Sequence, residues 1–193
     1  MDFLKRKDKI LIDAIDILDK YGTHGLTTRE IAKREGISEP AVYRQYTGKK
    51  DIIMNILDKY AEFDNYISDT IDKNGMSFKE GINFYVKSYA EYYENYPQIC
   101  TVMFSYDLYK YEENTRDKMQ KILSNRSEYL ISYCDLAKKN EEISKDIETE
   151  DLVDLLQSVI WWYVFKWKTF DYQFTLKEKL LEVVNRTFKD IYS

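Results

Sequence analysis

Hydrophobic residues recur along most of the chain at the three-and-four-residue spacing of amphipathic helices. One face of the helix expected between Phe3 and Tyr21 carries Ile10, Leu11, Ala14, Ile15 and Leu18. The same spacing predicts further helices over residues 28–35, 39–46, 49–72, 78–94, 114–139, 152–167 and 175–191. No segment has a convincing strand pattern, so the predicted fold class is all-α.

Capping and turn residues mark the ends of two short helices near the start of the chain. Thr27 is followed three residues later by Glu30, which is the capping-box spacing that opens a helix. Gly36 ends this helix after about two turns, and Ser38 can cap the next one. Pro40 then falls in the first turn, where its missing N–H has no helical acceptor to lose.

Charge is distributed unevenly along the chain. Residues 1–50 hold 11 Lys and Arg against 8 Asp and Glu, a net of +3, whereas the remainder holds 18 against 26, a net of −8. A positively charged N-terminal part, called the head below, followed by a negatively charged remainder is typical of a nucleic-acid-binding protein with a separate second domain. We therefore expect a head over residues 1–48 and a second domain over residues 49–193.

The remaining composition argues against catalytic or metal chemistry. Cys100 and Cys134 stand without a CxxC partner and His24 is the single histidine, so spacing cannot assemble a zinc site. The sequence has no nucleophile elbow and no glycine-rich phosphate loop. Its most apolar stretch, residues 155–165, is shorter than the about 20 residues that span a bilayer. We expect a cytoplasmic protein with reduced thiols, no cofactor, no signal peptide and no enzymatic activity.

Residues 28–42 have the spacing of a helix-turn-helix. Ala32 is small enough to let two helices approach, Gly36 makes the turn, and Val42 plugs the corner between them. The outward residues of the second helix would then enter the major groove of DNA. The predicted DNA-binding residues are Thr28, Arg29, Ser38, Glu39, Pro40, Ala41, Tyr43, Arg44, Gln45 and Lys49.

These residues differ in the contact that their chemistry favours. The guanidinium of Arg44 can donate two hydrogen bonds to the edge of guanine. Gln45 can reach a base or a phosphate. Tyr43 and Lys49 are suited to the DNA backbone, which positions the protein without reading sequence. Thr28 and Arg29 stand at a helix start, where free N–H groups bind phosphate. Glu39 can accept from a cytosine amino group or merely favour the helix start.

The stretch GLTTREIAKREGISEPAVYRQYTGKKDII resembles the DNA-binding segment of the TetR family of repressors. The matching positions are Thr27 or Thr28, Ile31, Ala32, Gly36, Ile37, Ser38, Val42, Tyr43, Tyr46 and Lys49. The resemblance implies a subunit of nine helices with a three-helix head, which forms a homodimer. It also implies a palindromic double-stranded DNA operator, from which a small, mostly apolar effector releases the protein.

The helix predicted over residues 152–167 is apolar around nearly its whole circumference. Such a helix must be covered on all sides, and a two-fold partner can cover what one chain leaves exposed. A helix buried in the core of a monomer is the alternative. In the family arrangement the last two helices form the dimer interface, for which the candidates are Val153, Leu156, Ile160, Val164, Trp167, Leu180, Val184 and Phe188.

An effector is expected among the middle helices, because aromatic side chains with polar tips suit a largely apolar ligand site. The candidate lining residues are Tyr85, Tyr89, Tyr93, Met103, Phe104, Tyr129, Tyr133 and Trp162, most of which could equally be core. An alternative function is an all-helical ligand carrier or protein-interaction module that does not bind DNA. A salt series separates the two, because binding through phosphates weakens steeply as salt rises.

Overall fold

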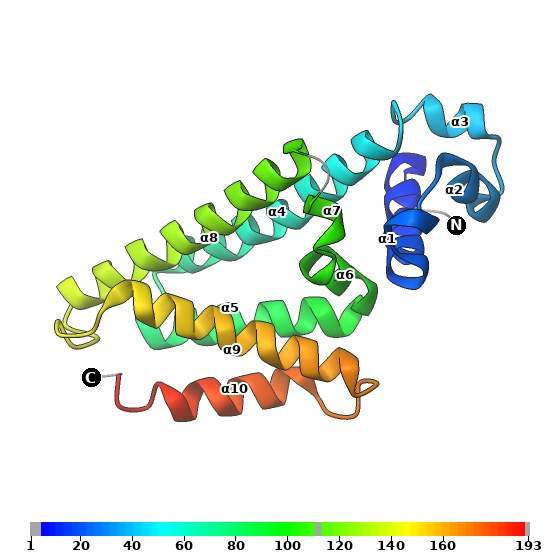
Figure 1. The fold of residues 1–193 in the computed structure, drawn as a ribbon. Helices are drawn as coiled ribbons and strands as arrows, with labels where there is room; N and C mark the ends of the chain where they lie inside the picture. Colours follow the sequence, from blue (N-terminus) through cyan, green and yellow to red (C-terminus); the bar gives the residue numbers. More distant parts are fainter. Residues whose placement is uncertain (1–4, 111–112, 192–193) are drawn as a thin grey trace. The chain divides into compact units, whose positions relative to one another are not determined.

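The computed structural model describes residues 5–110 and 113–191, and every regular element within them is helical (Figure 1). The elements are α1 (Arg6–Gly25), α2 (Thr28–Glu35), α3 (Glu39–Tyr43), α4 (Lys49–Asn74), α5 (Phe78–Asn95), the 3₁₀ turn η1 (Pro97–Ile99), α6 (Cys100–Phe104), α7 (Asp107–Lys110), α8 (Glu113–Lys139), α9 (Thr149–Thr169) and α10 (Leu176–Thr187). The predicted all-α class is confirmed, and the described part contains ten α-helices where about nine were expected.

Two predicted helix ends differ from the observed ones. Gly22, expected just past the end of the first helix, does leave helical geometry with φ 66°, but one more turn follows and α1 ends at Gly25. The predicted start at Phe3 lies outside the described residues. The helix expected to run to Tyr46 ends at Tyr43, because the chain turns there and brings the Tyr46 side chain into the core.

The first compact unit comprises Met1–Glu62 and Gln98–Ile122. Its most deeply buried side chains include Ile10, Ala14, Ile17, Leu18, Ile31, Val42, Tyr46, Ile52 and Leu57, together with Cys100 and Val102 of α6. Polar contacts add to this core: Arg34 of α2 binds Asp13 of α1, with Nε 2.8 Å from Oδ1, and also binds Asp16. These contacts fix α2 against α1, and α3 in turn packs against α2.

The second compact unit comprises Phe63–Pro97 and Leu123–Ser193. In it α5 packs against α9 and α10, which lie side by side (Figure 1). Gly81 allows a close approach of α8 to α5, since a Cβ there would stand 2.0 Å from the Tyr133 hydroxyl. That hydroxyl hydrogen-bonds to the carbonyls of Met76 at 2.9 Å and Ser77 at 2.8 Å. The contact ties α8 to the start of α5.

The helices α4 and α8 each contribute residues to both compact units. The predicted second domain begins at residue 49, where α4 begins, whereas the first compact unit extends to Glu62 and includes α6 and α7. A functional boundary at 48/49 therefore stays a prediction. Within the described ranges, no helix has the length and apolar character needed to cross a membrane.

The residues predicted for the dimer interface lie instead in the core of the second unit. All eight are 0–6% exposed within a single chain: Val153, Leu156, Ile160, Val164, Trp167, Leu180, Val184 and Phe188. They lie on α9, on α10 and at the C-cap of α10, and they are already buried within one chain, so a role for them at a dimer interface stays a prediction. The large apolar residues that α9 leaves exposed are a different set, namely Leu155, Trp161, Trp162 and Phe165.

Candidate DNA-binding surface and ligand site

The turn between α2 and α3 is built as its sequence predicts. Thr27 caps α2 by accepting a hydrogen bond from the Glu30 N–H at 3.1 Å. Gly36 then adopts the left-handed conformation with φ 69° and ψ 31°, which favours glycine. Ala32 and Val42 are buried in the corner between the two helices. These contacts hold α3 across α2 in the geometry of a helix-turn-helix.

Most of the predicted DNA-binding residues are exposed on this head. They are Arg29, Ser38, Pro40, Tyr43, Arg44, Gln45 and Lys49. Ala41 is an exception, because it is only 5% exposed. The outward orientation predicted for Ala41 is therefore wrong: α3 has a single inner face, and Ala41 shares it with Val42. Ser38 stands at the N-cap position of α3 without a capping side-chain hydrogen bond.

Thr28 links the start of α2 to α3. Its hydroxyl donates to Oε1 of Glu39 at 2.5 Å and lies 3.3 Å from the Tyr43 hydroxyl. Thr28 is buried and Glu39 half-buried, so this oxygen of the carboxylate is held inside the head. The contact explains an acidic residue in an otherwise positive segment, because Glu39 joins the two helices and also stands in the first turn of α3.

The start of α4 is tied to the rest of the head. The Lys49 ammonium donates to the carbonyl of Thr23 near the end of α1, so this exposed side chain already has one partner. Asp51, in the first turn of α4, accepts from the N–H of Thr47, which lies just before the helix, at 2.8 Å. Asp51 was not among the predicted site residues, although a threonine followed four residues later by an aspartate at a helix start was visible in the sequence.

A second candidate site lies among α4, α5 and α8 in the second unit. It is a cavity of about 70 Å³ lined by Asp64, Asn65, Ile67, Ser68, Tyr85, Tyr89, Asn125, Arg126 and Tyr129. The Arg126 guanidinium binds both oxygens of Asp64, with N–O distances of 3.0–3.1 Å. The Tyr89 hydroxyl also donates to Asp64, and the guanidinium stands 5.0 Å from the centre of the Tyr89 ring.

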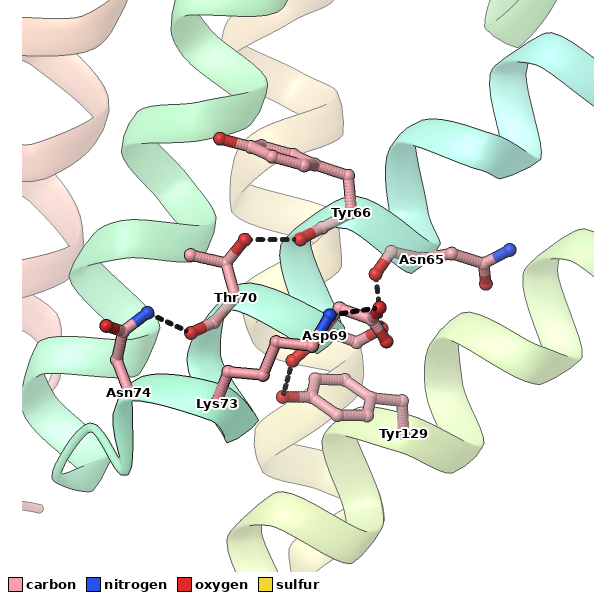
Figure 2. A network of polar contacts seen from close by, with 8 residues as sticks. Asn65, Tyr66, Asp69, Thr70, Lys73, Asn74 and Tyr129 are labelled. Atoms are coloured by element: carbon pink, nitrogen blue, oxygen red, sulfur yellow. Dashed lines mark hydrogen bonds and ion pairs between the residues drawn. The ribbon is translucent and has the colours of Figure 1, made fainter.

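Burial dominates the electrostatics of this cavity. It raises the pKa of the Asp64 carboxyl, while Arg126 and the Tyr89 hydroxyl oppose that rise. Tyr129 of α8 points its hydroxyl at α4 (Figure 2). The hydroxyl lies 3.0 Å from an Asp72 oxygen and 3.4 Å from the Ser68 carbonyl. Burial also raises the pKa of Tyr129, so the phenol stays protonated and donates.

The part of α4 beside this cavity makes several side-chain hydrogen bonds to its own backbone (Figure 2). The Thr70 hydroxyl donates to the Tyr66 carbonyl at 2.6 Å, and the Asn74 amide donates to the Thr70 carbonyl at 2.7 Å. Lys73 pairs with Asp69 at 3.0 Å. Back-bonding of this kind competes with the helical ladder and often bends a helix.

Of the eight predicted ligand residues, Tyr85, Tyr89 and Tyr129 line this cavity. Tyr93 and Tyr133 are buried without lining it, and Trp162 is 52% exposed on α9. Met103 and Phe104 lie on α6 in the other compact unit. The charged pair was missed in the sequence because its members stand 62 residues apart, with no local pattern to connect them.

Comparison with known proteins agrees with this architecture. Residues 10–55 match the family model described as "Bacterial regulatory proteins, tetR family". Forty residues are 40% identical to the class A tetracycline repressor protein from transposon 1721 of Escherichia coli, a match that covers 21% of this chain and 18% of that protein.

Two solved structures have the same fold over nearly the whole chain. The fatty acid degradation regulator FadR from Bacillus halodurans superposes with a TM-score of 0.82 at 17% identity, covering 96% of this chain and 95% of that one. FadR from Bacillus subtilis, solved in complex with stearoyl-CoA, has a TM-score of 0.78 at 19% identity and covers 92% and 97%.

Fold and head together define an all-helical protein of the helix-turn-helix DNA-binding class. Residues 10–55 carry the DNA-binding segment of the TetR family of regulators, and the whole chain shares the fold of solved regulators of this kind.

Proposed function

We propose that the chain is a repressor that binds a palindromic DNA operator as a homodimer and leaves it when a small ligand binds. The observation that carries the proposal is the exposed row of Pro40, Tyr43, Arg44 and Gln45 on and just after α3. These residues follow the turn of the helix-turn-helix in the sequence, and they lie in the segment that matches the TetR family. Such a helix presents its outer residues to the major groove.

The roles proposed in DNA binding follow from chemistry and exposure. Arg44 reads guanine through its fork, with Gln45 beside it. Tyr43 and Lys49 bind the DNA backbone, and for this Lys49 exchanges the Thr23 carbonyl for a phosphate. Thr28 acts chiefly by fixing Glu39 and Tyr43 rather than by a side-chain contact of its own.

The homodimer is proposed to form through the exposed aromatic face of α9. Trp161 and Trp162 are both about half-exposed, and their rings stack on Phe165 with centroids 5.6 and 6.2 Å apart. Leu155 extends the face by two helical turns. A patch of this kind on a helix of a water-soluble protein marks a protein interface, and the two-fold symmetry of a palindromic operator requires a symmetric partner.

The effector is proposed to bind at the cavity around Asp64 and Arg126. Its polar atoms and tyrosine rings suit a ligand with an apolar body and a polar group. At about 70 Å³ the cavity holds only a few water-sized groups, so a larger ligand requires α4, α5 and α8 to separate. A ligand that binds better to the separated state shifts the population toward it. Long-chain acyl-CoA is the first candidate, because FadR from Bacillus subtilis was solved with stearoyl-CoA.

The DNA-binding proposal is tested by selecting duplexes from a random library and measuring affinity by fluorescence anisotropy. Arg44→Ala is expected to relax preference at one position in each half-site, at about 1–3 kcal/mol. Lys49→Ala should weaken all selected duplexes alike, and Arg116→Ala, an exposed arginine on α8, is the matched control. Failure to enrich any duplex, or equal losses in all three variants, would contradict the proposal.

The dimer has its own test, light scattering after size exclusion. The native chain is expected at twice its 23.2 kDa, and Trp162→Glu should shift the population to single chains because it places a charge in the interface. Tyr172→Glu, at an exposed aromatic residue outside α9, is the control. A single-chain mass for the native protein at micromolar concentration would rule the dimer out.

A further inference from the structure

A second hollow lies between α4 and α5, and it shares no lining residue with the cavity around Asp64 and Arg126. Its volume is about 320 Å³, which falls in the range of small-molecule sites. Five aromatic side chains make up most of its wall: Phe63, Tyr66, Phe84, Tyr92 and Tyr96. Neither the proposed DNA contacts nor the proposed effector cavity uses any of them.

The rings at this hollow are arranged as a stack. Phe63 lies between two tyrosines, with its centroid 4.2 Å from Tyr92 at an interplanar angle of 21° and 6.2 Å from Tyr66 at 24°. The Tyr89 ring meets Phe63 edge-on at 5.5 Å and holds it from the core side. Tyr66 is 59% exposed. A flat ring that enters the hollow can therefore extend a stack that the protein has already built.

The charges at the hollow are balanced. Glu91 and Lys87 are the two ionised lining residues, and they stand 4.0 Å apart. Glu91 is also 3.1 Å from Lys177 of α10. A charged ligand would gain little from this lining, because each ionised side chain there already has a partner of opposite charge. The Ser88 hydroxyl and the Asn95 amide also line the hollow and offer hydrogen bonds to the edge of a ring.

We infer that the hollow between α4 and α5 binds an uncharged, flat aromatic molecule with a hydrogen-bonding group on one edge. The stacked rings supply affinity for the face of the ligand, and the absence of net charge in the lining selects against ions. The site stands whether or not the chain is a ligand-released repressor, because it rests on residues outside the effector cavity.

Three probes of one size but different charge test the inference by isothermal titration calorimetry of the full chain: 2-naphthol, N-methylquinolinium and 2-naphthoate. We expect 2-naphthol to bind with a stoichiometry of one per chain and more tightly than either ion. Tyr66→Ala should weaken its binding about five-fold, as the loss of one stacking partner predicts. Tyr66→Phe should keep most of the affinity because it retains the ring.

Two control variants locate the binding. Tyr106→Ala removes a 73% exposed tyrosine of the other compact unit, and Asn125→Ala changes the lining of the effector cavity. Both are expected to bind 2-naphthol like the native chain. The inference is overturned if no probe binds, if either ion binds more tightly than 2-naphthol, or if a control loses as much affinity as Tyr66→Ala. Circular dichroism confirms that each variant is folded.

Discussion

The paired charges of Asp64 and Arg126 give the most direct test of how the second unit is held together. Replacing Arg126 by methionine keeps much of the side-chain volume but removes the guanidinium that binds both oxygens of Asp64. The carboxylate then stays in a site that is only 16% exposed, with the Tyr89 hydroxyl as its remaining donor. The substitution therefore leaves a largely buried charge without its counter-ion.

The expected loss in the free energy of unfolding is about 3 kcal/mol, near the low end for breaking a buried pair because Asp64 keeps some contact with water. For a chain of this size, that corresponds to a fall in Tm of roughly 6–12 °C. The double variant Asp64→Asn with Arg126→Met should recover much of this loss, because no buried charge remains. Arg116→Met, at a half-exposed arginine on the same helix, should change stability by less than about 0.5 kcal/mol.

Urea unfolding followed by circular dichroism measures all four proteins, at one protein concentration because dimerisation affects stability. The pH dependence gives a second readout. Burial already raises the pKa of Asp64, and loss of Arg126 raises it further. A carboxyl whose pKa is higher in the folded than in the unfolded state lowers stability above that pKa, and this loss disappears as the pH falls through it.

The difference between the native chain and Arg126→Met should therefore shrink as the pH falls through the raised pKa of Asp64, whereas the double variant should show no such change. The reasoning is refuted if Arg126→Met is as stable as Arg116→Met. It is also refuted if the double variant is as unstable as the single one, since the loss would then come from packing rather than from an unpaired charge.

Three further predictions concern packing in the second unit, the thiols and the DNA-binding head. Gly81→Ala should destabilise the chain by about 1–3 kcal/mol, because the added Cβ would meet the Tyr133 hydroxyl at 2.0 Å; a urea midpoint equal to or above the native one contradicts this. Cys100 and Cys134 are both buried, and burial raises the pKa of Cys134 to about 12. Neither thiol should therefore react with Ellman's reagent in the folded chain at mildly alkaline pH. Both should react once the chain is unfolded in urea. Thr28→Val should weaken binding to a selected duplex by less than Arg44→Ala does, because Thr28 acts through Glu39 and Tyr43; an equal loss would indicate a direct contact.

Local signals in the sequence predict the head well. The cap at Thr27, the left-handed turn at Gly36 and the buried corner at Ala32 and Val42 each depend on residues a few positions apart. Ala41 was misplaced because it was assigned to the outer face together with Glu39, Pro40, Tyr43 and Arg44. In the structure Ala41 lies beside Val42 on the buried face of α3.

Contacts between distant residues explain what the sequence did not predict. That the apolar helix over residues 152–167 is covered on all sides stays a prediction, because periodicity alone cannot tell which side packs within the chain. The structure buries Val153, Leu156 and Val164 and exposes Trp161 and Trp162. The pair Asp64 and Arg126 becomes visible only when α4 and α8 are brought together, because no capping or spacing rule links residues so far apart.

The measurement that tests the central claim most directly is the salt dependence of binding to a selected palindromic duplex. Fluorescence anisotropy of the labelled duplex is recorded between about 50 and 200 mM salt, the range in which phosphate contacts make affinity fall steeply. The account predicts tight binding at low salt, a linear decrease of log affinity with log salt, and two chains per duplex. An affinity that does not change with salt, or no binding at the lowest salt, would contradict it.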